Sequence, residues 1–201
     1  MGIALNKTTL KAQRDQAKTF KQFLPSLELR RQQLLAAVKA ARAWMTEIEI
    51  RIEENRRRLD PLYPLLGSSN ISTLNTDKLV RVRALKIEME NVVGTRVPVL
   101  RDVDFEYSDY STLATPFWFD HLIESLRQMC RLRVEHQVAQ QRLDVLEREA
   151  RRITQRVNLF EKILIPQAEQ NIRRIVIFLS DQERAAVVRS KISKKKQSAD
   201  A

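Results

Sequence analysis

The sequence predicts a mainly α-helical protein: a long antiparallel two-helix coiled coil with a small β-hairpin-containing knob at the bend. Two distant stretches carry apolar residues at alternating steps of three and four, and the stretch between them changes to a period of two. Only three glycines occur in 201 residues. A stripe with a period of 3.5 residues is typical of a coiled-coil seam, because the broader face of a globular helix follows 3.6.

These patterns divide the chain into four expected segments. They are an N-terminal shaft helix over residues 1–60, a knob with a short β-hairpin over 61–115, a C-terminal shaft helix over 116–193 and a basic flexible tail over 194–201.

The seam of the first helix is apolar except at Gln13, Arg31 and Asn55. Its positions are Leu10, Gln13, Ala17, Phe20, Leu24, Leu27, Arg31, Leu34, Val38, Ala41, Met45, Ile48, Ile52, Asn55 and Leu59. Pro61, Pro64 and Gly67 follow, and we expect them to end the helix.

The seam of the second helix is polar only at Ser125 and His136. It comprises Leu122, Ser125, Met129, Leu132, His136, Ala139, Leu143, Leu146, Ala150, Ile153, Val157, Phe160 and Leu164, and it continues at Ala168, Ile172, Ile175 and Leu179. The step from Leu164 to Ala168 shifts the seam as a stutter does, and the nearby Pro166 favours a kink at this level, shared with Pro25.

In an antiparallel helix pair the numbers of residues at the same level have a constant sum, and this sum defines the register. Sums of about 184, 191 and 198 all pair a positions of one helix with d positions of the other. We favour 191, because it sets Asn55 opposite His136, so that one buried polar group hydrogen-bonds the other. The same register sets Arg31 opposite Phe160 and Ala41 opposite Ala150.

The hairpin is predicted from two alternating runs. They are Val80, Val82, Leu85, Ile87 and Met89, and then Val97, Val99, Val103, Phe105 and Tyr107. The turn is expected near Gly94, and Pro98 confines its strand to an edge. Thr115 is expected to cap the second helix, with Pro116 in its first turn.

Composition narrows the function to a structural or interaction protein. The net charge of +11 suggests nucleic acid or an anionic membrane as a partner, but both helices mix charge signs, which is typical of a solvated rod. With two histidines, no glycine-rich phosphate loop and no metal-ligand spacing, we predict no catalytic, cofactor-binding or metal-binding residue and no cofactor. One cysteine, Cys130, excludes an internal disulfide, and no apolar run reaches the roughly 20 residues that span a bilayer, so a cytoplasmic location is expected.

Three blocks of sequence resemble the D subunit of the V-type and archaeal-type rotary ATPases, in that family's order. They are LNKTTLK at 5–11 with LELRRQQL at 27–34, ENVVGTRVP at 90–98, and TQRVNLFE at 154–161 with DQER at 181–184. The chain departs from the family at 159–160, where Ala-Leu is usual, and residues 62–78 match no recognised segment.

This resemblance implies the non-catalytic rotor shaft of the central stalk, which couples ATP hydrolysis or synthesis in a catalytic ring to proton or sodium transport, at the periphery of the membrane. The implied partners are the catalytic and regulatory subunits of the ring, the small central-stalk F subunit and a membrane-rotor cap subunit, with no nucleic acid. Expected ring contacts are Leu5, Leu10, Val187, Val188, Lys191 and Ile192, and expected lower-rotor contacts are Val93, Gly94, Val97 and Val99. The alternative is a free-standing basic coiled-coil adaptor that binds a membrane surface or nucleic acid.

Overall fold

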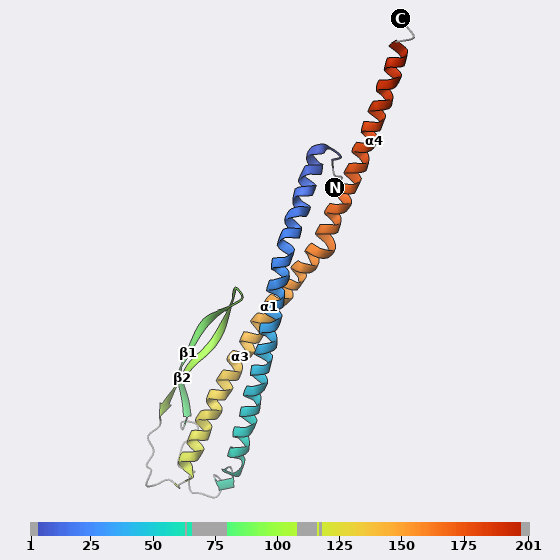
Figure 1. Cartoon of the computed structure of the whole chain (residues 1–201). Helices are drawn as coiled ribbons and strands as arrows, with labels where there is room; N and C mark the ends of the chain where they lie inside the picture. Colours follow the sequence, from blue (N-terminus) through green and yellow to red (C-terminus); the bar gives the residue numbers. More distant parts are fainter. Residues whose placement is uncertain (1–3, 63, 66–79, 108–115, 117, 198–201) are drawn as a thin grey trace. The chain divides into compact units, whose positions relative to one another are not determined.

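The computed structural model describes residues 4–62, 64–65, 80–107, 116 and 118–197. The chain is mainly helical with one two-stranded antiparallel sheet, as predicted (Figure 1). Its elements are α1 (Lys7–Leu59), the 3₁₀ turn η1 (Asp60–Leu62), β1 (Val80–Val92), β2 (Thr95–Tyr107), α3 (Phe119–Leu159), the π-helical turn η4 (Phe160–Leu164) and α4 (Ile165–Gln197).

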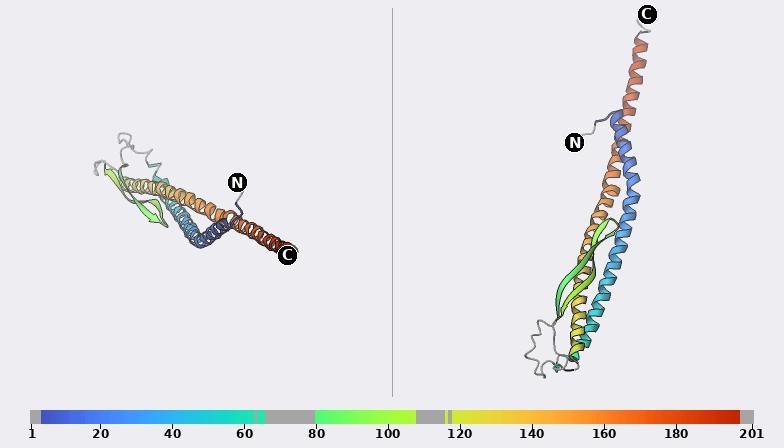
Figure 2. Two further views of the ribbon diagram at one scale, coloured as in Figure 1. Left: turned by 90° about the horizontal axis from the view of Figure 1, so that it is seen from above. Right: turned by 90° about the vertical axis from the view of Figure 1, so that its left-hand side faces the viewer.

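The chain forms two compact units. The terminal unit combines Met1–Arg31 with Arg152–Ala201, and the hairpin unit is Gln32–Arg151. In the terminal unit α1 runs antiparallel to α4, and in the hairpin unit the rest of α1 runs antiparallel to α3 (Figures 1 and 2). The prediction of an antiparallel two-helix coiled coil is therefore confirmed in each unit.

The predicted seams form the cores of these helix pairs. None of the predicted seam positions is exposed, and the deepest have almost no accessible surface: Leu34 is 1% exposed, and Ile48, Val157 and Ile175 are each 0% exposed. Full burial of such a side chain contributes roughly 1.5–3 kcal/mol. The seam, rather than intrinsic helix propensity, therefore supplies most of the stability of the long helices.

The helix ends follow local chemistry that the sequence revealed in part. Asn6 caps α1, since its Oδ1 accepts the Thr9 N–H at 2.7 Å. Pro61 lies in η1, directly after the end of α1, as expected. The second helix begins later than predicted, at Phe119, so Pro116 precedes it; Thr115 lies outside the described residues. The last helix continues to Gln197, beyond the expected boundary at 193.

A π-helical turn is found where the seam predicted a stutter. In η4 the N–H of Ile165 donates to the carbonyl of Phe160, five residues back, which adds one residue to that turn. Pro166 follows directly; it has no N–H to donate, and its ring clashes with the carbonyl four residues earlier in a regular helix. The wider turn relieves this clash and carries the seam from Leu164 to Ala168 without exposing either residue.

The hairpin has the predicted strands and turn. Val92 pairs with Thr95, and the two-residue loop between them has positive φ at both Val93 (52°) and Gly94 (76°), the requirement of a type I′ turn. The register shifts between Val82 and Ala84 and between Lys86 and Ile87. The first shift, a β-bulge at Arg83, explains why the apolar alternation slips by one residue between Val82 and Leu85.

The hairpin lies back along the helices of its unit, where the sequence predicted a compact knob at the bend. Both views in Figure 2 and the view in Figure 1 draw β1 and β2 beside α3. Nearer the chain reversal, a small core joins the two helices through Leu59, Phe119, Leu122 and Ile123, with Val80 of β1 packed against it.

Candidate functional site

The C-terminal part of α4 extends beyond α1 as a single helix in the terminal unit (Figure 1). Near the start of α1, Lys7 Nζ lies 3.8 Å from Glu183 Oε1 of α4, and every side chain from 184 to 195 is exposed. This segment includes Val187 and Val188, each 55% exposed, and Ile192, 53% exposed. An isolated helix of this length is marginal in water, so an apolar ridge on it indicates a surface that a partner covers.

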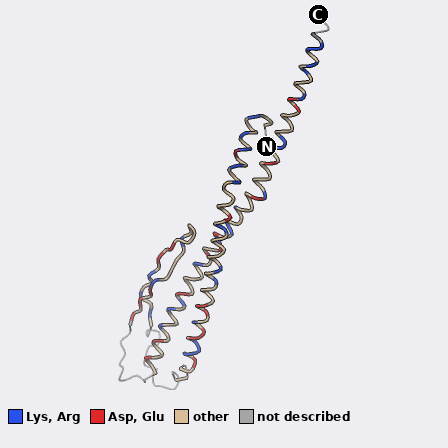
Figure 3. The backbone as a smooth tube through the Cα atoms, in the orientation of Figure 1, with Lys and Arg blue, Asp and Glu red and all other residues tan. Residues whose placement is uncertain are grey.

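The same segment is strongly basic. From Arg184 to Gln197 the sequence has six lysines and arginines and no acidic residue (Figure 3). Basic residues near a helix C-terminus interact favourably with the helix dipole. The segment therefore offers an apolar ridge in a basic field, which suits a partner with apolar and acidic groups.

The other predicted ring contacts differ in their exposure. Leu5 is 40% exposed and precedes α1, whereas Leu10 is half-buried and lines a groove with Val176 and Leu179 of α4. Lys191 is exposed. Leu10 thus belongs mainly to the α1–α4 seam.

The hairpin docks on both helices of its unit. Glu90 of β1 forms an ion pair with Arg142 of α3 (Oε2 to Nη1, 3.2 Å), and the Arg142 guanidinium lies 5.9 Å from the ring centre of Trp44 on α1. Val97 of β2 is 0% exposed, and Val99 lines a groove with Ala37, Ala40, Ala41, Trp44 and Leu146. A two-stranded ribbon cannot bury its own residues, so Val97 is covered by the helices.

This docking corrects part of the predicted lower-rotor contact. Val97 has no exposed surface to offer a partner, and Val99 packs toward the chain's own helices. Val93 and Gly94 stay a prediction at the hairpin tip. Sequence reasoning missed the roles of Trp44, Arg142 and Glu90. The available signal was the small-residue spacing of Ala37, Ala40 and Ala41 beside Trp44, which permits a close approach of another element.

The predicted pairing of Asn55 with His136 is wrong. Asn55 is 2% exposed, and its Nδ2 donates to the backbone carbonyl of Ser125 at 2.9 Å. His136 Nε2 lies 3.4 Å from Glu49 Oε1 instead. Glu49 and Asn55 are separated by about 1.7 turns of α1.

Two further contacts in the hairpin unit support the same correction. Arg51 Nη2 lies 2.7 Å from Glu135 Oε1, and Leu59 packs with Leu122 and Ile123. The residue numbers sum to 186 for Arg51 and Glu135 and to 181 for Leu59 and Leu122. Both sums are closer to the 184 register than to the favoured 191 register. A shift of one heptad still pairs seam positions with seam positions, so periodicity cannot choose between the two registers. The choice rested on a side-chain pair, and the buried amide found a backbone carbonyl instead.

One contact at the seam of the terminal unit agrees with this register, since the numbers of Gln13 and Asn171 sum to 184. Asn171 Nδ2 donates to Gln13 Oε1 at 3.1 Å, so one polar exception in the seam is satisfied across the helix pair. Phe160 packs edge-to-face on Phe20 at 5.4 Å between ring centroids, where the sequence predicted Arg31.

The predicted pairing of Ala41 with Ala150 concerns the hairpin unit. Both residues are buried, but in the 184 register Ala41 is level with Leu143 instead.

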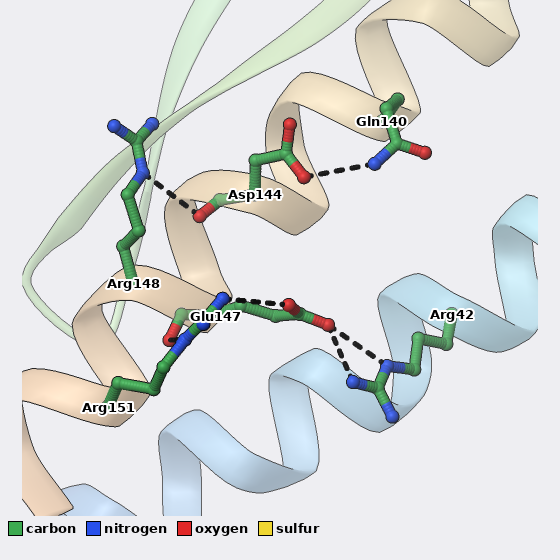
Figure 4. Close-up of polar contacts among 6 residues, drawn as sticks. All are labelled: Arg42, Gln140, Asp144, Glu147, Arg148 and Arg151. Carbon is green, nitrogen blue, oxygen red and sulfur yellow. Dashed lines mark hydrogen bonds and ion pairs between the residues drawn. The ribbon is translucent and has the colours of Figure 1, made fainter.

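A polar network spans the surface of the hairpin unit (Figure 4). Arg42 Nη2 of α1 lies 2.6 Å from Glu147 Oε1 of α3, and Glu147 Oε2 also pairs with Arg151 at 3.3 Å. The Arg42 side chain is 63% exposed, so such a pair contributes at most about 1 kcal/mol. Because both side chains are long, this contact does not discriminate between the registers.

Among the residues that the structure describes, Glu169 and Cys130 have shifted pKa values. A hydrogen bond and the charge of Lys21 lower the pKa of Glu169, whose Oε1 lies 2.8 Å from Lys21 Nζ. Burial raises the pKa of the Cys130 thiol, so little thiolate forms at neutral pH.

Neither group belongs to a recognisable reactive centre. Within the described residues, no three His, Cys, Asp or Glu side chains gather in a way that suits a metal ion. No described helix combines the length and apolar character that a membrane crossing requires.

Comparison with known proteins decides the family. The sequence profile of the ATP synthase D subunit matches residues 9–195. The chain belongs to the family of ATP synthase D subunits. It is 36% identical to the V-type ATP synthase D subunit of Borreliella burgdorferi (strain ATCC 35210 / DSM 4680 / CIP 102532 / B31), over 96% of this chain and 93% of that protein. It is 35% identical to that of Chlamydia muridarum (strain MoPn / Nigg), over 96% and 95%, and 30% identical to that of Chlamydia pneumoniae, over 96% and 92%.

The family agrees with the fold, since a helical hairpin of coiled-coil type is the form expected of a stalk component in a rotary ATPase. Membership also gives the exposed features of this chain a context, because one component of a complex is expected to leave surfaces that the others cover.

Proposed function

We propose that this chain is the rotor shaft in the central stalk of a V-type or archaeal-type ATPase or ATP synthase, and that it couples ATP turnover in a catalytic ring to proton or sodium transport. The observation that carries the proposal is the single-helix end of α4, with an apolar ridge and no acidic residue from 184 to 197. Family membership supports it, because the relatives are named as D subunits of V-type ATP synthases.

The shaft acts mechanically and is not itself catalytic. Buried seams hold the two helices of each pair together, and α1 alone, with 53 residues, extends roughly 80 Å at 1.5 Å per residue. A shaft without rotational symmetry presents different faces to the ring's catalytic sites as it turns. Rotation and nucleotide state are then coupled, because the contacts differ between states.

The proposed ring contacts are Leu5, Val187, Val188, Lys191 and Ile192, with Leu10 at the edge of the seam. The apolar ridge would meet apolar groups on the inner surface of the ring, and the basic side chains would meet acidic ones. The small F subunit and a membrane-rotor cap subunit are the proposed partners of the hairpin unit, with Val93 and Gly94 among the contacts.

The test replaces the ridge while keeping the helix. We expect Val187→Ser/Val188→Ser to lower the ions pumped per ATP hydrolysed several-fold in the reconstituted complex. The control, Ala185→Ser/Ala186→Ser, adds the same hydroxyl groups one residue pair away and should leave coupling unchanged. ATP hydrolysis and ion pumping are measured side by side, and a pull-down of the small F subunit reports whether the rest of the stalk is intact.

Deletion of residues 187–201 should have the same effect in stronger form. The proposal fails if the serine pair and the deletion both assemble and pump normally. If binding to anionic vesicles or nucleic acid is lost at the same time, the free-standing adaptor takes its place.

A further inference from the structure

Side chains of the two helices meet along one flank of the seam. In an antiparallel coiled coil, the residue three positions after a d position is a g position, and g residues of the two helices lie beside each other. The hairpin unit shows this pairing directly: Arg51 and Glu135 form an ion pair at 2.7 Å, and the Arg142 guanidinium lies 5.9 Å from the ring centre of Trp44. In both pairs the residue numbers sum to 186. We call the row of g positions the g flank.

The same rule sets Phe23 beside Ile163 in the terminal unit. Their numbers also sum to 186, and each lies three residues after a phenylalanine of the seam. Those two phenylalanines, Phe20 and Phe160, are in contact, with ring centroids 5.4 Å apart. Phe23 is 57% exposed, Ile163 is 54% exposed, and Leu159, one turn before Ile163, is 42% exposed. These three side chains form an uncovered apolar patch.

Two arginines lie side by side on the g flank, one heptad from this patch. The numbers of Arg30 and Arg156 again sum to 186. Neither forms an ion pair with the described residues, and Arg30 Nε is buried without a hydrogen-bond partner there. Two positive charges at one level repel each other, so this level lacks an acidic group. The flank of the terminal unit does not supply one, since its remaining members are Gln16, Asn171 and Phe178.

One heptad from the patch in the other direction, the flank is polar but uncharged. Gln13 Nε2 donates to Gln16 Oε1 at 2.9 Å, and Gln13 Oε1 accepts from Asn171 Nδ2 at 3.1 Å. The opposite flank of the same unit is charged, and it carries the ion pair between Lys21 and Glu169 at 2.8 Å. Depletion of charge around an exposed aromatic residue is typical of the core of a protein interface.

From these observations we propose that the g flank of the terminal unit is a docking groove for an α-helix of a partner protein. The helix places apolar side chains on Phe23, Ile163 and Leu159. One heptad further along the same face it places an acidic side chain between Arg30 and Arg156. Residues seven apart on a helix are separated by about 10 Å, which is the spacing of these two levels. The mode is recognition of an amphipathic helix in a groove, and it is independent of the proposed function, since it rests on the terminal unit alone.

The flank suits a helix better than other occupants. A helix satisfies its own backbone groups, whereas an extended segment would find no backbone partners on a helix pair. A second copy of the flank would bring no acidic residue: aligned one way it sets Arg30 and Arg156 against themselves, and aligned the other way against Gln16 and Asn171. An anionic membrane would match the arginines, but three apolar side chains bury little surface in a bilayer.

The test uses an alanine-rich helical peptide of about 20 residues, with leucines on one face and two glutamates one heptad further along that face. A matched peptide has glutamines in place of the glutamates. Both carry a fluorophore and are titrated with the purified full chain at low salt, and binding is followed by anisotropy. We expect the glutamate peptide to bind about fivefold more tightly, as exposed ion pairs allow, and the difference should disappear at high salt.

Two pairs of substitutions test the apolar patch. Phe23→Ser/Ile163→Ser removes it and should weaken the binding of both peptides at least about tenfold. The control, Leu29→Ser/Ile177→Ser, removes apolar residues that are 56% and 62% exposed. Leu29 and Ile177 each lie two residues after a d position and point away from the flank, so this control should bind like the wild type. Circular dichroism checks that each variant keeps its helices.

Replacement of Arg156 by glutamate tests the charge. The Arg156 side chain is exposed, so the substitution leaves the seam intact. Arg156→Glu should remove the preference for the glutamate peptide while changing the affinity for the glutamine peptide by less than about twofold. A purely structural role of Arg156 would weaken both peptides alike.

The proposal is overturned if neither peptide binds, if both peptides bind equally, or if the two serine pairs weaken binding alike. A glutamate preference that survives Arg156→Glu also overturns it. Concentration-dependent dimers abolished by Phe23→Ser/Ile163→Ser would put a second copy in place of the partner helix. Phosphatidylserine vesicles that bind the wild type but not this variant would put a membrane there.

Discussion

Replacement of Asn55 by leucine tests the register of the hairpin unit. Asn55 is 2% exposed; its amide nitrogen is bonded to the Ser125 carbonyl, and its Oδ1 has no hydrogen-bond partner among the described residues. The single bond contributes roughly 0.5–1.5 kcal/mol, whereas an unsatisfied buried acceptor costs about 1–3 kcal/mol. The Ser125 carbonyl keeps its own helical hydrogen bond when the asparagine is removed.

The expected result of Asn55→Leu is therefore a gain in the free energy of unfolding of about 1–2 kcal/mol, because leucine also buries more apolar surface at the seam. His136→Leu should change stability by less than about 1 kcal/mol, since its contact with Glu49 is exposed on both sides, at 33% and 54%. The assay is urea unfolding of the isolated chain, followed by circular dichroism.

The double variant is the decisive measurement. Glu49, the partner of His136, lies about 9 Å along α1 from Asn55, so the two substitutions should add within about 0.5 kcal/mol. If Asn55→Leu instead destabilises the chain and His136→Leu restores the loss, the two side chains share a layer. The 191 register would then be correct and the register described above would be refuted.

Three further predictions follow from named contacts. In a chain without Cys130, cysteines at Ala41 and Leu143 should form a disulfide on mild oxidation, detected by gel mobility, whereas cysteines at Ala41 and Ala150 should not, because a heptad shift of about 10 Å exceeds the reach of a disulfide. Val93→Gly should raise the thermal stability of the hairpin by about 1 kcal/mol, because a β-branched residue is strained at a φ of 52°; unchanged amide-exchange rates in β1 and β2 would contradict this. Lys21→Met should return the lowered pKa of Glu169 to its ordinary range in an NMR titration, and the stabilisation from this pair should vanish as the pH falls through the lowered pKa, since only the ionised carboxylate is favoured.

The sequence was sufficient to predict those features that depend only on the spacing of residues along the chain. The steps of three and four identified every seam position from Leu10 to Leu59, and the extra step near Leu164 marked the π-helical turn, because both follow from residue spacing alone. The hairpin turn at Val93 and Gly94 was equally local.

The register and the docking of the hairpin depend on contacts that spacing does not encode. A heptad shift conserves the apolar seam, so the choice needed the partner of one buried amide, and Ser125 supplies a backbone carbonyl that no sequence pattern marks. The covered face of the hairpin was unpredictable for a related reason. Val97 and Leu85 are both apolar, and only the position of Trp44 and Arg142 determines which is buried.

The docked hairpin supplies what the seam lacks. In a coiled coil whose apolar stripe repeats every seven residues, one helix can slide by one repeat and recover similar apolar contacts. The seam alone therefore does not determine the register. Glu90 of the hairpin pairs with Arg142 of α3, and Val99 lines a groove together with Trp44 of α1. Neither Trp44 nor Arg142 repeats one heptad away, where the residues are Arg51 and Glu149 or Ala37 and Glu135. The docked hairpin therefore fixes the register of the two helices. A slip of one heptad would break the ion pair between Glu90 and Arg142, and it would separate Val99 from the groove that Ala37, Ala40 and Ala41 line. A side element of two strands therefore holds the two helices of the hairpin unit in one register.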